Sequence, residues 1–490
     1  MKRTTTLLNQ LLIFNYSLLI LSSCSIEKQI AKSAKADVLG TKALQTAHVG
    51  ISIFEPATNK YLYSYQGDKY FVPASNTKLP TCYAAMKYLG DSLVGLRYGI
   101  PEEKYYQDKL IVVQPTGDPT LLHTDYIRQP VYDFLEKRFR NTKIEMGWMD
   151  TIWKEAGWGS GWSWNDYEEP YMAERSPLPI YGNTISITLN EVKDRNINED
   201  YYEKNIKLFK TGISYFDSLV NKNTIQTISR GQFKNPIQKW IIRRSIERNI
   251  FSAERSEKPF SSLAMAFVAN GASTAMEILE QSFNKRWGYS GPLKEKNAYY
   301  YDCYGCDGAI IHISQWFKIH SQPTDSLLKP MMHRSDNFFA EQSLLMVSNE
   351  RLGIMNDEKI IDTLLKTDFK DLPQKPRWVD GSGLSRYNLF TPQDFVAILN
   401  KMKNEFGMER IKVILPTGGE GTISNYYKAD SGYIYGKTGT LSGVVAFSGF
   451  LYTKKGKLLI FSTLVNNHQA SAAEVRKAME KFLQGIRNRY

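Results

Sequence analysis

The segment Phe71-Val72-Pro73-Ala74-Ser75-Asn76-Thr77-Lys78 decides how this 490-residue chain is interpreted. It predicts a loop entering an apolar helix that runs to about Leu89, with Pro80 tolerated because it lies in the first turns. A lysine three residues after a serine lies on the same helix face, so the Lys78 amine can contact the Ser75 hydroxyl. Serine is a weak nucleophile at its free pKa, and a buried lysine can act as its base. The segment therefore predicts a nucleophilic serine.

The sequence on either side of this segment predicts an α+β fold. Alternating apolar residues indicate a strand pair at 50–54 and 61–65, and two hydrophobic strands follow at 444–452 and 457–465. A final amphipathic helix is predicted over 471–486. We therefore expect an antiparallel sheet flanked by helices.

Residues 101–255 differ in composition from their surroundings. They are rich in Tyr, Trp, Asn and Lys and contain only short strand-like pieces. A chain of this length exceeds what a single core usually supports. The simplest assembly is a catalytic domain, at 46–100 and 256–490, that is split by a β-rich insertion at 101–255.

Two further motifs follow in the order that serine acyl-transfer enzymes with a lysine base require. Ser335-Asp336-Asn337 falls within a helical stretch, and Lys437-Thr438-Gly439-Thr440 begins a predicted strand. Ser-x-x-Lys, Ser-x-Asn and Lys-Thr-Gly each recur elsewhere in this chain by chance, so no single motif carries the argument. Their order and their settings match the penicillin-binding proteins and serine β-lactamases.

More of the sequence resembles one family of that class. Gly117–Leu121, Asp380–Arg386 and the stretch from Leu415 to Thr422 are similar to segments of the D-alanyl-D-alanine carboxypeptidase/endopeptidase family (peptidase family S13, the class C low-molecular-mass penicillin-binding proteins). The resemblance extends over most of the chain from about residue 46. It implies an enzyme that cleaves D-alanyl bonds in peptidoglycan stem peptides and cross-links, without a cofactor, and that β-lactams acylate.

Each catalytic motif has a physical task in such a reaction. Ser335 can relay a proton to the leaving amine, and Asn337 can hydrogen-bond the substrate backbone. Lys437 supplies positive charge that helps to keep Lys78 neutral and attracts the terminal carboxylate of the substrate. The backbone N–H of Ser75 is expected to form one half of an oxyanion hole.

The strand motif is expected to bind the end of the substrate. The hydroxyls of Thr438 and Thr440 can hydrogen-bond its carboxylate, and Gly439 permits close approach of its backbone. The N–H of Thr440 is expected to complete the oxyanion hole.

The family resemblance also implies a pocket in the insertion. Asp166 matches an aspartate that meets the amino end of the diamino acid of the stem peptide, and Tyr171 matches an aromatic residue lining that pocket. An alternative interpretation is that the aromatic residues around Asp166 simply pack one domain against another.

The first 24 residues indicate export. Lys2 and Arg3 precede an interrupted apolar stretch, and Leu21-Ser22-Ser23-Cys24 resembles a bacterial lipobox. We therefore expect a signal peptide at 1–24, lipidation of Cys24, and a flexible tether at 25–45. The expected location is periplasmic and lipid-anchored, on the outer membrane rather than the inner one.

Composition and motifs exclude several other functions. The net charge of +12 comes from scattered basic residues, so we expect no nucleic-acid partner. Cys303 and Cys306 form a lone CxxC, the histidines form no HExxH, and no metal site is expected. Cys82 is expected to be buried. Two alternatives to the peptidase remain: a penicillin-reactive wall-binding or sensor protein with little turnover, and a β-lactamase or esterase on the same fold.

Overall fold

The computed structural model describes residues 26–149, 151–189, 209–217, 219, 240–255, 262–292, 297–302 and 308–490. Contacts divide the chain into two compact units. The first comprises the residues up to Ala84 together with Leu328–Asp336 and Ile361–Tyr490, and the second comprises Ala85–Leu327 and Asn337–Ile360. The second unit is therefore longer than the insertion expected at 101–255, because the sequence up to Leu327 packs within it.

The first unit is built on a five-stranded sheet that joins the two ends of the chain. Every neighbouring pair in it is antiparallel. The strand order is β15 (Ile434–Leu441), β16 (Val444–Tyr452), β17 (Leu458–Asn466), β1 (His48–Glu55) and β2 (Lys60–Tyr65).

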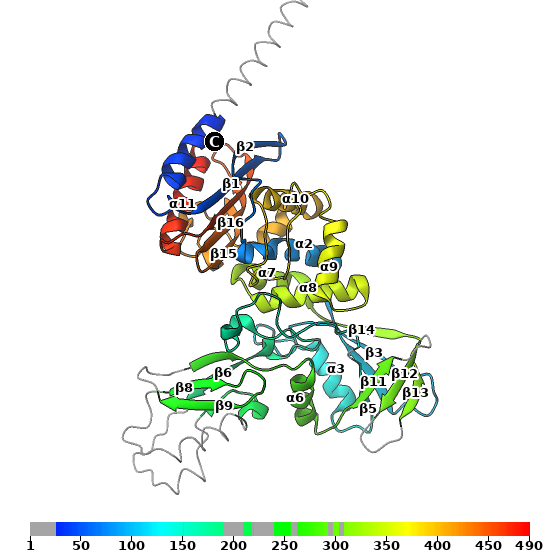
Figure 1. The fold of residues 1–490 in the computed structure, drawn as a ribbon. Coiled ribbons are helices and arrows are strands. Elements are labelled where there is room, and N and C mark those ends of the chain that lie inside the picture. Colours follow the sequence, from blue (N-terminus) through cyan, green and yellow to red (C-terminus); the bar gives the residue numbers. More distant parts are fainter. Residues whose placement is uncertain are drawn as a thin grey trace, which may run out of the picture. The chain divides into compact units, whose positions relative to one another are not determined.

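Helices cover both faces of this sheet, which explains why its central strands are buried along nearly their whole length and are mostly apolar. Helix α11 (Ala472–Arg489) packs on one face, and α10 (Pro392–Ile414) packs on the other (Figure 1). The side chains of β16 are buried from Val444 to Leu451. A strand buried on both faces reads as a continuous hydrophobic run rather than an alternating one.

The tether expected at 25–45 is instead part of the folded first unit. Residues 26–34 are helical and continue into a π-helical turn, Lys35–Leu39. Ile30, Ala34 and Val38 are buried in the same core as α11. They recur every fourth residue and so form an apolar stripe, and the Lys and Ala that suggested a linker are good helix formers.

The second unit contains a seven-stranded mixed sheet. Strand β5 pairs in parallel with both of its neighbours, and the other described pairs are antiparallel. The order is β13 (Ala309–His312), β12 (Ala298–Asp302), β11 (Gly288–Pro292), β5 (Glu145–Trp148), β4 (Leu110–Pro115), β3 (Ser92–Gly99) and β14 (Trp316–Pro323).

Helices and two smaller sheets pack with the seven-stranded sheet in this unit. Buried residues of α3 (Pro130–Phe139) and α6 (Ser273–Phe283) share one apolar core with strands of the seven-stranded sheet and of the two smaller sheets. The smaller sheets are β10-β6-β7, formed by Ser262–Ala266, Thr184–Leu189 and Phe209–Lys210, and the ribbon of β8 (Trp240–Arg244) and β9 (Phe251–Arg255).

The helix that follows Ser75 agrees with the sequence prediction, whereas the helix expected around Ser335 is interrupted. Helix α2 spans Lys78–Tyr88 and so ends next to Leu89, and α9, which carries no motif, spans Asp357–Lys366. The expected helical stretch around Ser335 is two helices, α7 (Thr324–His333) and α8 (Asn337–Leu352), with Ser335 in the break between them. Its φ of +64° lies in the left-handed region and ends the helical path.

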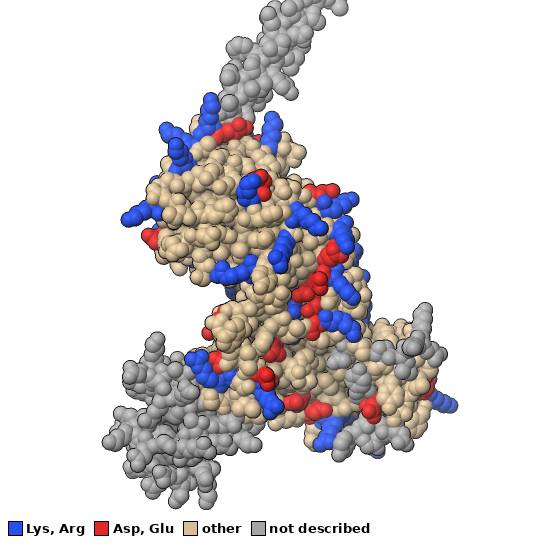
Figure 2. Space-filling model, in the orientation of Figure 1, with Lys and Arg blue, Asp and Glu red and all other residues tan. Residues whose placement is uncertain are grey.

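The surface agrees with the expectation of scattered charge. On the face shown in Figure 2, Lys and Arg are dispersed singly and in places alternate with Asp and Glu, rather than forming one continuous basic track. Within the described residues, no helix combines the length and the apolar character needed to cross a bilayer.

Candidate active site

Ser75 lies in a tight turn at the start of α2. The turn is a 3-10 helix, Ala74–Thr77, that leads directly into Lys78. Ala74 has a φ of +47°, which is an unfavourable conformation for a residue with a Cβ atom. Such strain is typical of functional sites, where the surrounding structure holds it in place. Ser75 Oγ lies 3.0 Å from the Nζ atom of Lys78.

Lys78 is fully buried and contacts the loop Asp380–Arg386. This loop lies between the second and third motifs in the sequence and is one of the segments that resemble the family. The Nζ atom of Lys78 lies 2.8 Å from the carbonyl oxygen of Ser382. Asp380 fixes this loop by accepting hydrogen bonds from the backbone N–H groups of Gly383, at 2.8 Å, and Ser385, at 2.6 Å. The sequence reasoning assigned this loop no task, although its Asp-Gly-Ser-Gly composition indicates a tight turn.

A second serine–lysine pair lies in the same unit. Lys437 Nζ lies 2.9 Å from Ser335 Oγ and donates a hydrogen bond of 2.8 Å to the carbonyl oxygen of Thr438. Lys437 is fully buried on strand β15. The structure therefore brings Ser335 and Lys437 together across 102 positions of sequence.

The two lysines disfavour each other's charge. Burial lowers the pKa of Lys437 well below its usual value, and the nearby Lys78 lowers it further. Lys437 was expected to carry the charge that keeps Lys78 neutral. Burial also opposes the charge of Lys437, so the pair of lysines loses one of its protons readily. A general base near a serine requires such a neutral amine.

Gly439 lies close to the turn that carries Ser75, a contact separate from the predicted approach of the substrate backbone. A Cβ atom there would lie 2.6 Å from the carbonyl oxygen of Pro73 and 2.9 Å from the Ser75 amide nitrogen. Strand β15 therefore lies directly against the turn that carries Ser75. Thr440 is exposed at the end of this strand, whereas Thr438 is mostly buried and donates to Thr422 Oγ1 at 2.7 Å.

The remaining predicted site residues lie together in the second unit. Asn337 begins α8 and donates from Nδ2 to the carbonyl oxygen of Tyr171 at 2.9 Å. The Tyr171 hydroxyl hydrogen-bonds Asp166, and burial together with this carboxylate raises the pKa of Tyr171 to about 12. The Tyr171 side chain is 46% exposed, so it is open to a ligand.

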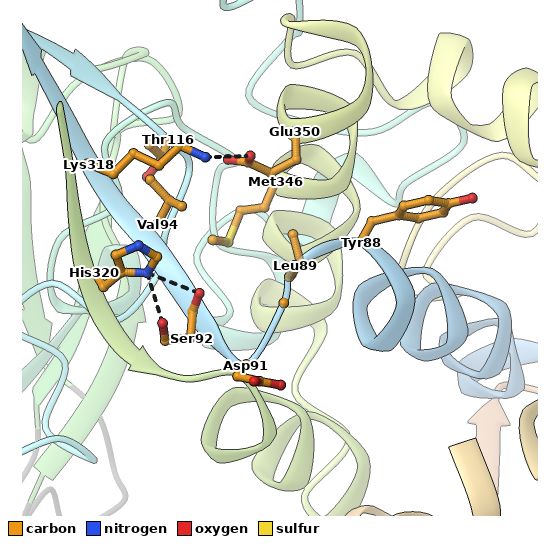
Figure 3. A pocket seen from close by; sticks show the side chains of 11 residues that line it. Tyr88, Leu89, Asp91, Ser92, Val94, Thr116, Lys318, His320, Met346 and Glu350 are labelled. Carbon is orange, nitrogen blue, oxygen red and sulfur yellow. Dashed lines mark hydrogen bonds and ion pairs between the residues drawn. The ribbon is translucent and has the colours of Figure 1, made fainter. Parts of the chain in front are cut away.

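A cavity of about 280 Å³ in the second unit lies apart from these residues. Figure 3 shows His320 directed at Ser92 and Lys318 at Glu350, with distances of 2.8 Å and 3.5 Å. His320 and Lys318 in its lining are therefore already paired, whereas the buried Thr116 hydroxyl has no hydrogen-bond partner among the described residues, and no predicted site residue lines the cavity.

The cysteines and possible metal ligands add no chemistry to the described site. Cys82 is buried, as expected. Cys24, Cys303 and Cys306 lie outside the described residues. No group of three or more His, Cys, Asp or Glu side chains in the described part of the chain is arranged to hold a metal ion.

The geometry of the first unit defines a class of enzyme. A serine hydroxyl 3.0 Å from a buried amine can transfer its proton to that amine and attack a carbonyl carbon. A buried lysine on the adjacent edge strand of the sheet completes the arrangement. Together with the antiparallel sheet flanked by helices, it is the arrangement of penicillin-binding proteins and serine β-lactamases.

The chain belongs to the D-Ala-D-Ala carboxypeptidase 3 (S13) family, whose model matches residues 31–486. It is 24% identical over 492 residues to D-alanyl-D-alanine carboxypeptidase DacB of Haemophilus influenzae, covering 92% of each chain. It is 25% identical to a D-alanyl-D-alanine carboxypeptidase of an Actinomadura species, covering 89% of this chain and 80% of the relative.

Solved structures show the same fold. Penicillin binding protein 4 (dacB) from Haemophilus influenzae superposes with a TM-score of 0.64 at 20% identity, covering 93% of this chain and 98% of the other. The family and the related sequences make this protein a serine-type D-Ala-D-Ala carboxypeptidase, a hydrolase of peptidoglycan.

Proposed function

We propose that this DD-peptidase acts through an acyl-enzyme on Ser75, as a carboxypeptidase on stem peptides, as an endopeptidase on their cross-links, or as both. The observation that carries the proposal is the 3.0 Å contact between Oγ of the partly exposed Ser75 and Nζ of the fully buried Lys78. A buried amine with a lysine neighbour is the type of base that a serine nucleophile needs.

In the acylation step, Ser75 Oγ forms a bond to the carbonyl carbon of the D-alanyl residue while its proton passes to Lys78. The resulting oxyanion accepts hydrogen bonds from the backbone N–H groups of Ser75 and Thr440. The C–N bond then breaks, and the leaving amine takes a proton through Ser335, whose hydroxyl contacts Lys437. A water molecule then hydrolyses the ester and regenerates Ser75.

Other residues orient the substrate in this proposal. Thr438 and Thr440 bind the carboxylate of the leaving residue, and Asn337 hydrogen-bonds the peptide backbone. Asp166 and Tyr171 receive the amino end of the diamino acid side chain. The support for this pocket is the contact of Tyr171 with both Asn337 and Asp166.

The experiment that tests the nucleophile is intact-protein mass spectrometry after mixing residues 25–490 with penicillin. We expect one drug mass to be added to the wild type and none to Ser75→Ala. The released D-alanine is then measured from a pentapeptide. An adduct on Ser75→Ala would refute the assignment, and drug consumption without a lasting adduct would favour a β-lactamase. A stable adduct with no D-alanine release would favour the wall-binding or sensor protein.

We further infer that the protein is exported to the periplasm and anchored through a lipid on Cys24, on the outer membrane. The support is the basic, apolar and small-residue order of residues 2–24, which ends on a cysteine. Cys24→Ser should leave the labelled fatty acid unincorporated and shift the protein from the membrane to the soluble periplasmic fraction. Membrane association that persists in this variant would refute lipid anchoring at Cys24.

A further inference from the structure

Arg476 of α11 contacts the exposed end of the strand that carries the third motif. Its Nη2 atom donates a hydrogen bond of 2.6 Å to Oγ1 of Thr440. Val475 and Met479, on the same helix, are buried in the core of the first unit and fix the position of this arginine. An arginine that no sequence motif indicated therefore reaches the position where the substrate carboxylate is proposed to bind.

This contact sets the direction of the Thr440 hydroxyl. A hydroxyl group has one hydrogen to donate and can accept at its oxygen. Since the oxygen of Thr440 accepts from the guanidinium, its hydrogen is left to donate to another acceptor. The exposed Thr440 thus offers a donor strengthened by an adjacent positive charge, which favours an anionic acceptor.

The charge of Arg476 lacks a counter-ion among the described residues. No described carboxylate lies within ion-pairing distance, and its buried Nε atom has no hydrogen-bond partner there. The guanidinium carbon lies 5.9 Å from the ring centroid of Tyr426, which stabilises a cation without neutralising it. A partly buried cation in this state would gain from an external carboxylate.

A second arginine of the same helix, Arg487, has its counter-ion within the fold. Arg487 pairs with the buried Asp430 at 3.3 Å, so the fold supplies its negative charge. Among the described residues, Arg476 instead has a neutral hydroxyl on the proposed substrate strand as its hydrogen-bond partner and a neutral aromatic ring beside it. The difference leaves the charge of Arg476 available for an anionic partner as far as the described residues go.

We propose that Arg476, acting with Thr440, binds the carboxylate of the leaving residue and makes the enzyme selective for substrates in which that group is free. This inference rests on the proposed function, since it needs a substrate acylating Ser75. It predicts that D-alanyl bonds followed by an amidated residue are poor substrates. The carboxylate of a penicillin should occupy the same position.

The test compares acylation by a penicillin with acylation by its methyl ester, which lacks the negative charge. Arg476→Gln should slow acylation by the free acid about 10- to 100-fold, the range for loss of one charge-assisted hydrogen bond. Acylation by the ester should change less than threefold, because the ester gains little from the cation. Arg476→Lys keeps the charge without the fork of N–H donors and should fall between the two.

Lys477→Gln is the matched control, since it removes the same charge from the next residue, which is exposed. It should leave the acid-to-ester ratio unchanged. A misfolded variant would lose both reactions, so the ratio separates folding from recognition. An Arg476→Gln enzyme with the wild-type ratio would overturn this inference alone, whereas equal adducts on wild type and Ser75→Ala would overturn the proposed function as well.

Discussion

The close approach at Gly439 gives the sharpest prediction of the proposed mechanism. Replacing Gly439 with alanine places a methyl group 2.6 Å from the Pro73 carbonyl oxygen and 2.9 Å from the Ser75 amide nitrogen. Ordinary contacts of a methyl carbon begin at about 3.5 Å. Strand β15 and the turn at Ser75 must therefore separate by several tenths of an ångström or more. Both proposed oxyanion donors, the N–H groups of Ser75 and Thr440, adjoin this contact.

Two magnitudes follow from this displacement. Overpacking of a close contact costs about 1–3 kcal/mol of folding stability. Loss of one well-aligned oxyanion donor costs about 3 kcal/mol in the transition state, which is roughly 100-fold or more in the rate of acylation. A loss of about 1–3 kcal/mol in stability would leave most of the enzyme folded, so it would change the acylation rate little. A fall of roughly 100-fold in the acylation rate would therefore report the displaced oxyanion donor.

The assay is the second-order rate constant for acylation by a penicillin, measured beside thermal unfolding. Gly485→Ala is the matched control, since it lies in α11 and its added methyl would meet no atom nearer than Ser33 Oγ at 4.0 Å. The control should acylate normally and gain up to about 1 kcal/mol of stability. If Gly439→Ala acylates within threefold of wild type, strand β15 does not position the oxyanion hole as proposed.

A buried ion cluster in the second unit supports two more predictions. Arg175 is 2% exposed and pairs with Asp357 at 2.5 Å and Glu155 at 3.2 Å. Arg175→Met should therefore lower the unfolding free energy by about 3–5 kcal/mol, because it leaves buried carboxylates without a counter-ion. Denaturant titration measures this loss, and Arg175→Lys should give an intermediate value. Burial and the neighbouring Asp357 raise the pKa of Glu155 to about 7 from an unperturbed 4.5. The stability that this raised pKa contributes is present below pH 4.5 and is lost as the pH rises to about 7, at most about 3 kcal/mol. Glu155→Gln should flatten the pH dependence of stability in that window, and an unchanged slope would contradict the assignment.

The sequence predicted the main strands and the final helix of the first unit because their signals are local and strong. The strand at 444–452 coincides with β16 (Val444–Tyr452), and the final helix expected at 471–486 corresponds to α11 (Ala472–Arg489). Hydrophobic runs and a Ser471 cap are properties of neighbouring residues, so they are visible without the fold. The 3.0 Å contact of Ser75 with Lys78 joins residues three positions apart, a spacing that is visible in the sequence.

Contacts between distant segments could not be predicted in the same way. Lys78 contacts the carbonyl oxygen of Ser382, which is 304 positions away in the sequence. Arg476 of helix α11 contacts Thr440 of strand β15. A backbone carbonyl has no sequence signature, and one arginine on an amphipathic helix looks like any other solvated charge. The left-handed φ at Ser335 is likewise set by packing and not by residue type.

The N-terminal helix yields a final prediction, because composition alone suggested a tether there. Ile30 is 1% exposed in the core shared with α11, and the Tyr490 hydroxyl donates to the Ile26 carbonyl oxygen at 3.0 Å. Ile30→Ala should therefore lower the unfolding free energy of the first unit by about 2–5 kcal/mol, whereas the exposed Gln29→Ala should change it by less than about 0.5 kcal/mol. Equal thermal midpoints for the two variants would mean that the stretch is a tether after all. If the helix is docked and Cys24 carries the proposed lipid, only Ser25 separates Cys24 from residue 26, a reach of about 7 Å. The catalytic unit would then be held close to the bilayer, and its access to the wall would be set by that short link.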